Sequence, residues 1–553
     1  MDNQKLILYV ALSFVLLLLW QAWQEDYGPK PPSSLATDVS PMLTTPATST
    51  LGAATGTNDV PKSNATGSAA LPAPVQPSLK SADRVHVVTD LLDLEIDTIG
   101  GDLRRAELRS YPAEVNHPEK PFRLLSDEPD HFFIAQGGLL GTNAPNHYAL
   151  FQADQTEYHL AEGATSLEVP LHWRDPSGSG IEVTKIYTFE RNHYSAQVRY
   201  QIRNHGASEW HGQVYTQFQR TEPTDGKSAL GVYTYTGGVV SSPENTYEKV
   251  DFARMKKEPL SKDFKGGWIA MIQHYFAAAW IPPADLPIHT YTKAIEWGRY
   301  VFGYTGPVVA VPPSGETTLS SKIYLGPKEP ERLKEAAPNL ELTVDYGKLT
   351  FIAQPIYWLL ALIQGVVFNW GWSIILLTVL IKAAFFHLSA TSYQSMAQMR
   401  KLTPKIQAIK ERYGEDRQKM NEAMMEIYRK EKINPLGGCL PIVVQIPVFI
   451  ALYWVLVESV ELRQAPWMFW IRDLAAQDPY YVLPLIMGVT MFIQQKLSPA
   501  PPDPIQAKVM MVMPIVFTGM FLFFPAGLVL YWVVNNTLSI AQQWYITNKI
   551  ANN

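Results

Sequence analysis

The sequence predicts a polytopic α-helical membrane protein that carries a large all-β domain outside the cytoplasm. Apolar runs of membrane-spanning length lie at the start and in the last third of the 553 residues. The middle of the chain alternates between apolar and polar residues, as half-buried strands do. A bilayer core needs roughly 20 apolar residues of helix. Because two structural classes share one chain, averages such as the net charge of −5 describe neither of them.

The N-terminal residues 1–27 are predicted to form a signal-anchor helix. The apolar run Leu6–Trp20 is long, Trp23 follows it, and no small-residue cleavage site precedes Glu25. These features favour an uncleaved anchor over a removed signal peptide and place the N-terminus in the cytoplasm. Residues 28–81 are rich in Pro, Ser, Thr and Ala, and this composition predicts a disordered linker.

Residues 82–343 are predicted to form a large antiparallel β-sandwich. Their strands show period-two alternation or β-branched and aromatic runs, and the clearest are Val85–Val88, Leu94–Asp97, Glu182–Phe189 and Gln197–Ile202. Turn residues separate them, at Gly100–Gly101, Asp175–Gly178, Asn204–Gly206 and Gly237–Gly238. Because this domain follows the first span, we expect it outside the cytoplasm.

No catalytic or metal site is predicted in the β domain. His193, His205 and His211 are close in sequence, but their spacing matches no metal or acid–base motif, so we expect surface or turn histidines. The single cysteine, Cys439, excludes a disulfide framework. We also find no P-loop and no nucleophile–base arrangement, and we expect no cofactor and no DNA partner.

A lysine in an apolar helix is the central feature of the last third. Residues 344–369 predict an interfacial amphipathic helix, and the break at Asn369–Trp372 starts a span at 372–393. Lys382 then lies about halfway along that span, where a charge costs about 2.5–3.5 kcal/mol on insertion scales. If the span instead began at Ile356, Lys382 would reach the cytoplasmic surface by snorkelling.

The helical core, residues 370–553, is predicted to have five spans, at 372–393, 439–457, 481–497, 509–524 and 527–546. No Asp or Glu lies deep in any of them, so Lys382 has no internal counter-ion. A midplane cation of this kind needs water or an external partner. We therefore predict a hydrated polar groove that receives a polypeptide segment. Its lining residues would be Lys382, Thr378, Gln445, Asn535 and Ser539.

Residues 399–432 predict a basic helical hairpin in the cytoplasm, because lysines and arginines outnumber acids there and are few in the loop 459–479. Thr403–Pro404 is predicted to start a helix, and Gly414–Arg417 is predicted to form a turn. The apolar stripes either pack on each other or contact clients. The predicted client or ribosome contacts are Met399, Leu402, Ile406, Ile409, Arg400 and Lys405. Both termini are then cytoplasmic.

Several motifs resemble the YidC/Oxa/Albino family of membrane insertases across essentially the whole chain. They are Asn434–Cys439, Val460–Pro466, Asp478–Tyr481, Met487–Met491 and Phe524–Trp532. The resemblance implies a five-helix insertase core and a periplasmic β-supersandwich of the Gram-negative type. It also implies a multi-pass protein of the bacterial inner membrane that inserts and folds inner-membrane proteins.

The same resemblance implies partners and site residues. The partners would be nascent membrane-protein clients, membrane lipids, SecYEG with its accessory proteins, and the ribosome or targeting machinery. The family's groove cation is usually Arg, and Lys382 stands in its place here, which keeps the charge and loses the planar donor fork. Trp532 occupies a groove-side position that is often Tyr, and it offers an aromatic surface for clients.

Two other functions stay open on sequence grounds. A secondary transporter for an anionic solute would use Lys382, but it predicts inverted repeats, and we see none. A membrane-anchored periplasmic carbohydrate-binding or carbohydrate-processing protein would need a convergent carboxylate or His site within residues 82–343. That alternative also leaves the polar residues of the core unexplained.

Overall fold

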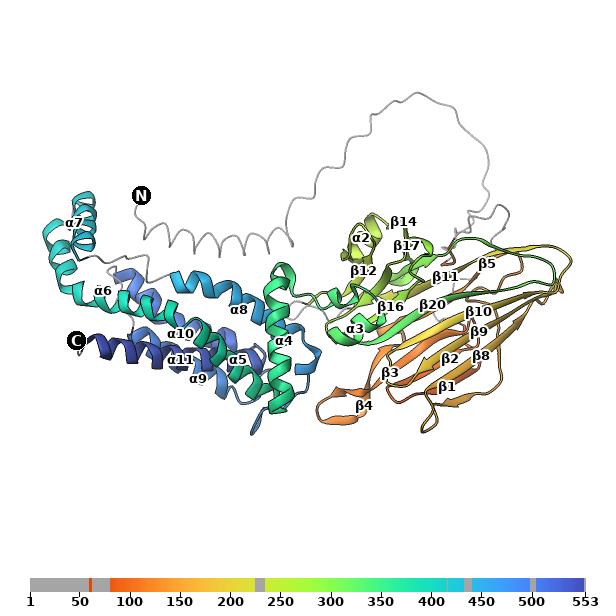
Figure 1. Cartoon of the computed structure of the whole chain (residues 1–553), viewed down its shortest axis with the longest axis horizontal. Coiled ribbons are helices and arrows are strands. Elements are labelled where there is room, and N and C mark those ends of the chain that lie inside the picture. Colours follow the sequence, from red (N-terminus) through yellow and green to blue (C-terminus); the bar gives the residue numbers. More distant parts are fainter. Residues whose placement is uncertain are drawn as a thin grey trace, which may run out of the picture. The chain divides into compact units, whose positions relative to one another are not determined.

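A computed structural model describes residues 59–61, 80–223, 234–414, 416–431, 440–497 and 504–551. The predicted signal anchor, residues 1–27, and most of the linker lie outside these residues. The same holds for the motif Asn434–Cys439. Figure 1 shows a β domain followed by a set of long helices.

Within the described residues the β domain consists of two large sheets (Figure 1). The first has the order β14-β17-β18-β11-β5-β3-β2-β1-β7, with β19 on β11 and β4 on β3. Its strands are β1 Arg84–Val88, β2 Leu92–Asp97, β3 Asp102–Glu114, β4 His117–Leu125, β5 Phe133–Gly141, β7 Glu157–His159, β11 Trp210–Thr221, β14 Ser261–Lys265, β17 Pro287–Ile295, β18 Arg299–Thr305 and β19 Val309–Val311.

The second sheet has the order β13-β12-β15-β16-β20-β10-β9-β8-β6. Its strands are β6 Gln152–Ala153, β8 Ser166–Arg174, β9 Ile181–Glu190, β10 Ser195–Asn204, β12 Gly237–Ser241, β13 Glu248–Val250, β15 Trp268–Ile272, β16 Phe276–Ile281 and β20 Glu316–Pro327. Two short helices, α2 Phe252–Lys257 and α3 Pro330–Ala336, complete the domain.

The predicted strands are confirmed where alternation was clearest. Along β1 and β10 every second side chain is buried, as expected for strands with one face in a sandwich core. Trp268 and Trp280 are fully buried in that core. Gly100 and Gly101 have φ of 76° and 58°, a conformation that glycine adopts without steric penalty, so the predicted turn is also confirmed.

One part of the linker prediction is wrong. Asp59 belongs to the segment 28–81, yet its side chain is buried against the β domain beside His147 and Tyr148. The low hydrophobicity of the whole segment predicts disorder. A single buried carboxylate is stabilised by hydrogen bonds and charge interactions with specific partners. The amino-acid composition of the segment does not reveal such contacts.

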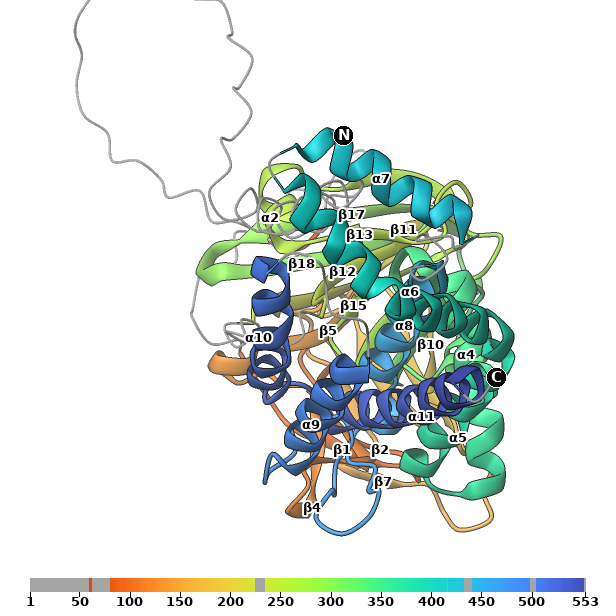
Figure 2. The ribbon, with the colours of Figure 1, turned by 90° about the vertical axis from the view of Figure 1, so that its left-hand side faces the viewer.

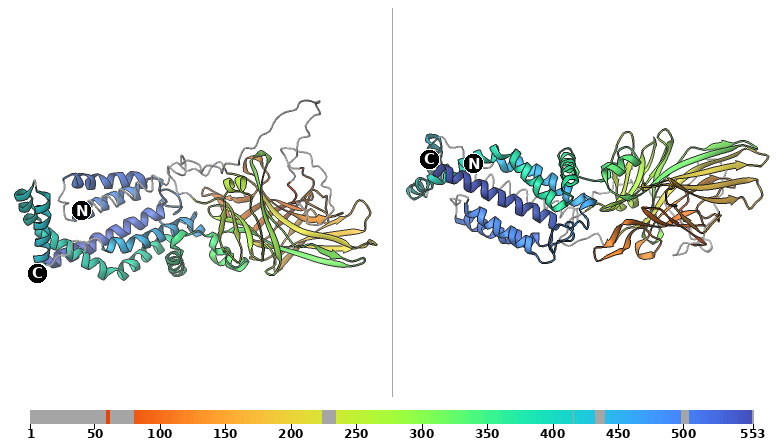
Figure 3. Two further views of the ribbon diagram at one scale, coloured as in Figure 1. Left: turned by 90° about the horizontal axis from the view of Figure 1, so that it is seen from above. Right: turned by 60° about the horizontal axis from the view of Figure 1, so that its bottom comes forward.

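The helical core contains seven long helices and the hairpin helix α7 within the described residues. They are α4 Thr350–Val367, α5 Trp370–Ala384, α6 Phe386–Tyr413, α7 Arg417–Lys430, α8 Leu440–Glu458, α9 Val482–Leu497, α10 Pro504–Phe521 and α11 Ala526–Ala551, with α5 and α6 forming one bent pair. Figures 1 and 3 show α8, α9, α10 and α11 running side by side, with α4 lying across them. Helix α11 packs on α5, α6 and α9, and α9 packs on α10.

The predicted break at Asn369 is confirmed. Helix α4 ends at Val367, Phe368 adopts a left-handed conformation with φ of 56°, and Asn369 caps α5 by accepting a 3.1 Å hydrogen bond from the Trp372 amide. The side-chain amide of Asn369 also donates to the Trp467 carbonyl over 3.1 Å. This boundary sets the direction of α5.

The predicted single helix over 372–393 is divided in the structure, and its crossing of the membrane stays a prediction. The helix breaks at Phe385, and its two parts, Trp370–Ala384 and Phe386–Met399, are bent by 64°. Lys382 therefore lies in the last turn of α5 and not halfway along a straight helix. Hydropathy does not register such a bend, because both sides of it are apolar and helical.

By length and hydropathy, Gly347–Val367 is the one helix among the described residues that is long and apolar enough by itself to cross a membrane. The bent pair α5–α6 passes only when taken together, and Val444–Glu458, Val482–Leu497 and Lys508–Phe521 are shorter apolar helices. The interfacial position of 344–369 and the five-span count therefore stay predictions.

The predicted helix start at Thr403–Pro404 is also wrong. Helix α6 continues from Phe386 to Tyr413 with Pro404 inside it. A proline within a helix removes one backbone hydrogen bond but does not always end the helix. The predicted turn after Gly414 is confirmed, because Asp416 caps α7 by accepting from the Lys419 amide. Figure 2 shows α7 beside the far part of α6.

Candidate functional site

The site is built around Lys382 at the C-terminal end of α5. Its ammonium donates a 2.8 Å hydrogen bond to the Ser539 hydroxyl on α11. No Asp or Glu forms an ion pair with Lys382 in the described part of the chain. The carbonyl end of a helix carries partial negative charge, which favours a cation in its last turn. This position offsets part of the penalty of placing the lysine among apolar helices.

Hydrogen bonds join Lys382 to residues of two further helices. The Ser539 hydroxyl donates to the Asn535 carbonyl over 2.7 Å, and the Gln445 amide of α8 donates to the Asn535 side chain over 3.2 Å. We call Lys382, Gln445, Asn535 and Ser539 the polar cluster. Lys382, Gln445 and Asn535 are half-buried, whereas Ser539 is buried. The structure thus brings together four of the predicted groove residues.

Thr378 and Trp532 lie near the polar cluster but are not bonded to it. Thr378 is buried one turn before Lys382, and its hydroxyl donates to the Ile374 carbonyl of its own helix. Trp532 packs edge-on against Phe449 of α8 and Phe521 of α10, with ring centroids 4.9 and 5.5 Å away. Trp532 is half-buried and supplies an aromatic wall one turn from Asn535.

Helix α11 has a second polar side that sequence reasoning missed. Asn536 and Gln543 are buried toward α9, where Asn536 donates to the Thr490 hydroxyl over 3.4 Å and Gln543 to the Leu497 carbonyl over 3.1 Å. The i, i+7 spacing of these two residues was the available signal. Because both are satisfied by α9, they join helices and leave the polar cluster to the other side.

The hairpin residues lie on α6. Leu402 is buried, Met399, Ile406 and Ile409 are half-buried, and Lys405 is exposed and pairs with Glu431 over 2.6 Å. The side chain of Arg400 lies outside the described residues. Partial burial of the stripe agrees with packing of α6 on α7 and leaves part of it open to other contacts.

A buried ion pair connects the core to the β domain. Lys328, just after β20, donates to Glu458 at the end of α8 over 2.9 Å. Nearby, Arg463 donates to the Ala113 carbonyl and Gln464 to the Pro112 carbonyl at the end of β3. These contacts hold the loop after α8 on the β domain.

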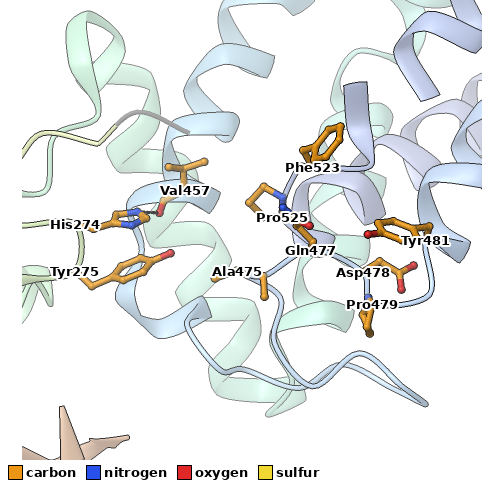
Figure 4. A pocket seen from close by; sticks show the side chains of 11 residues that line it. His274, Tyr275, Val457, Ala475, Gln477, Asp478, Pro479, Tyr481, Phe523 and Pro525 are labelled. Atoms are coloured by element: carbon orange, nitrogen blue, oxygen red, sulfur yellow. Dashed lines mark hydrogen bonds between the residues drawn. The ribbon is translucent and has the colours of Figure 1, made fainter. Parts of the chain in front are cut away.

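A pocket of about 590 Å³ lies next to this connection (Figure 4). His274, Tyr275 and Val457 line one side, and Gln477, Tyr481, Phe523 and Pro525 line the other. Burial, together with the charge on Lys328, lowers the pKa of His274 to about 4, so a neutral ring donates to the Val457 carbonyl over 2.9 Å. None of the predicted site residues lines this pocket.

The three predicted surface histidines do not converge. His193 pairs with Glu335 over 2.9 Å, His205 with Glu182 over 3.6 Å and His211 with Glu209 over 3.3 Å. Among the described residues no group of three or more His, Cys, Asp or Glu side chains is arranged to hold a metal ion. The polar cluster is therefore the arrangement on which a function can be built.

Comparison with known proteins assigns both parts of the chain. Residues 84–359 match the family model of the YidC periplasmic domain, and residues 362–553 match the model of the 60Kd inner membrane protein. A membrane protein insertase YidC of Methylococcus capsulatus is 51% identical and is covered over 99% of its length by 100% of this chain. The corresponding protein of Alkalilimnicola ehrlichii is 50% identical, with 100% of this chain and 96% of the relative covered.

A solved structure of an active YidC insertase with its first transmembrane domain aligns with 85% of this chain and 94% of that chain. The identity is 18% and the TM-score is 0.38, so this alignment carries no weight beside the sequence matches. Two family models together cover most of the chain, and relatives at about half identity cover it end to end. The chain belongs to the YidC family of membrane protein insertases.

Proposed function

We propose that this protein inserts and folds inner-membrane proteins by holding polar client residues at the polar cluster. Its family makes it an inner-membrane insertase, which is not an enzyme. The observation that carries the site assignment is the 2.8 Å bond between Lys382 and Ser539, in a lysine that has no acidic partner in the described residues. An unpaired cation among apolar helices is a functional feature by default.

Lys382 has donors left for a client. An ammonium has three N–H groups, and Ser539 accepts one of them. The remaining two serve water or a carboxylate of a translocated segment. Lysine binds as a flexible point charge, so we expect attraction for acidic residues without the paired geometry that an arginine fork provides. Such weak binding suits a client segment that must leave Lys382 again during insertion.

Client hydrophobicity supplies the driving force. Burial of apolar surface is worth about 25 cal/mol per Å², so a client span gains far more on entering lipid than one polar residue loses. The polar cluster acts on the barrier by replacing part of the water around polar client residues. Trp532, Phe449 and Phe521 offer an aromatic surface beside it for the apolar residues of the client.

The proposed topology follows from charge and from the position of α4. The lysines and arginines of α6 and α7 favour a cytoplasmic hairpin, which supports cytoplasmic termini and a periplasmic β domain. Helix α4 lies across α5 and α8 (Figure 1), as an interfacial helix on the periplasmic side would. We propose that the groove around the polar cluster opens to the cytoplasm and to lipid.

The proposed partners are nascent membrane proteins, lipids, the SecYEG translocon with its accessory proteins, and the ribosome or its targeting machinery. Exposed basic residues of the hairpin, such as Lys405 and Lys419, support contact with phosphate-rich surfaces. Cooperation with the translocon rests on the family assignment alone.

Reconstitution tests this function. Vesicles containing only this protein receive a single-span client with an acidic translocated tail, and insertion is compared for wild type, Lys382→Arg, Lys382→Ala and Lys382→Glu. Wild type and Lys382→Arg should insert the client, while Lys382→Ala and Lys382→Glu should lose most activity. No insertion by wild type contradicts the insertase function of the isolated chain. Equal activity in all four contradicts the role of Lys382.

A further inference from the structure

The segment Asp59–Pro61, which precedes the β domain in sequence, enters a buried polar site of that domain. Asp59 is only 7% exposed. Its carboxylate accepts a hydrogen bond from the Tyr148 hydroxyl and lies 3.3 Å from Nε2 of His147. Both partners are almost 90 residues further along the chain. A carboxylate is rarely buried unless it is paired, so the contact is specific.

The receiving residues are held rigidly. His147 is fully buried, its Nδ1 lies 2.5 Å from the Tyr215 hydroxyl, and its amide donates to the same oxygen over 3.0 Å. The backbone at His147 is so close to Gly100 that a Cβ there would lie 2.6 Å from the His147 carbonyl oxygen. The loop that presents His147 and Tyr148 is therefore held by contacts that do not involve Asp59.

Charge complementarity favours a carboxylate at this position. Two buried cations, Arg104 and Lys185, lie near one buried carboxylate, Asp102, at 3.5 and 4.0 Å. Burial raises the pKa of Asp102, which weakens its ability to balance both cations. Nε and Nη1 of Arg104 have no hydrogen-bond partner among the described residues. The Asp59 carboxylate interacts with His147, which also acts on Asp102, and it favours the charged form of Arg299.

The linker sequence suits such a contact. Pro61 fixes its own φ and disfavours the helical conformation for Val60, so the segment is biased toward an extended form before binding. Less conformational entropy is then lost when Asp59 docks.

We propose that His147, Tyr148 and the buried cations near them form a carboxylate-binding peptide site whose occupant is Asp59–Pro61 of the same chain. We call it the linker-anchoring site. It attaches one point of the predicted linker 28–81 to the β domain.

Limited proteolysis of the full chain tests the site in cis. Trypsin cleaves after Lys62, three residues beyond Asp59, and after Lys80, which serves as an internal reference. Asp59→Asn keeps the shape and removes the charge. It should raise the rate of cleavage at Lys62 relative to Lys80 by about tenfold, the effect expected from losing a hydrogen bond to a charged group. An unchanged ratio contradicts the proposal.

A peptide in trans separates anchoring from general destabilisation. A labelled peptide of residues 55–65 should bind the full chain carrying Asp59→Ala, in which the site is vacant, at least about tenfold more tightly than its Asp59→Asn counterpart. It should bind wild type weakly, because the site is filled. His147→Gln should abolish binding, and the matched change His211→Gln on β11, outside the site, should not. Equal binding of the two peptides overturns the proposal.

Discussion

Lys328 and Glu458 form a 2.9 Å ion pair in which the two side chains are only 2% and 4% exposed. Lys328 follows the last strand of the β domain, and Glu458 is the last residue of α8. The ammonium also donates to the Thr343 carbonyl over 3.2 Å. The contact between the β domain and the core thus includes an ion pair that is buried away from water.

Removing one of these charges should destabilise the junction strongly. Lys328→Met leaves the Glu458 carboxylate buried without a partner, which typically costs about 3–5 kcal/mol. Adding Glu458→Leu should restore much of the free energy of unfolding. The matched control is Lys334→Met, which breaks the exposed pair with Glu331 and should cost less than about 1 kcal/mol. Unfolding in detergent measures all of them. Similar losses for Lys328→Met and Lys334→Met would refute a buried junction.

Glu461 should make stability depend on pH. This residue of the loop after α8 accepts a hydrogen bond from the Tyr357 hydroxyl of α4. Burial raises its pKa from 4.5 to about 7, against the opposing effect of the Tyr357 bond. The folded protein therefore binds the proton more tightly than the unfolded chain does.

Proton linkage determines whether stability rises or falls with pH. Stability contributed by Glu461 is fully present below about pH 4.5 and is lost as the pH rises through about 7. Glu461→Gln should reduce the pH dependence of the unfolding free energy between pH 5 and 7. Glu331→Gln, at an exposed position, should leave that pH dependence as in wild type. An identical slope in wild type and Glu461→Gln would show that the carboxyl titrates normally.

Helices α9 and α10 should not tolerate a methyl group at Gly488. A Cβ there would lie 2.2 Å from the Thr518 hydroxyl, so Gly488→Ala should separate the helices and cost about 1–3 kcal/mol. Gly519→Ala on α10 is the matched control, because nothing lies within 4 Å of its Cβ position. Thermal unfolding in detergent distinguishes the two. If both variants unfold alike, the close approach of α9 and α10 at Gly488 is wrong.

The hairpin should be needed for insertion but not for folding of the core. Within the hairpin, Lys405 of α6 pairs with Glu431 just after α7, and such an exposed ion pair adds little stability. Deletion of residues 403–432 should reduce insertion in vesicles while the circular dichroism and melting temperature of the remaining helices stay close to wild type. Normal insertion by the deletion variant would remove the hairpin from the mechanism.

Sequence patterns predicted the helices and strands better than the bends and breaks between them. Alternation located strands such as β1 and β10, and polar spacing placed Asn535 and Ser539 on one side of α11. The bend at Phe385 was not predictable, because apolar residues continue across it and packing against α11 decides the direction.

Single side chains were the hardest to predict. Thr378 shares a helix face with Lys382, but a threonine can satisfy its hydroxyl on its own helix, and here it does. Asp59 lies in a segment whose composition predicts disorder, and its burial depends on residues almost 90 positions away. Long-range pairing of this kind leaves no local signal.

The central claim is that client polypeptide lies against the polar cluster. With Cys439 replaced by Ser, a cysteine at Asn535 is tested for disulfide formation with a cysteine in a stalled client. Thr537→Cys, two residues away and exposed with its hydroxyl bonded to its own helix, is the matched control. We expect cross-linking from position 535 and little from 537. Equal cross-linking from both, or cross-linking from 537 alone, would contradict the claim that the polar cluster receives the client.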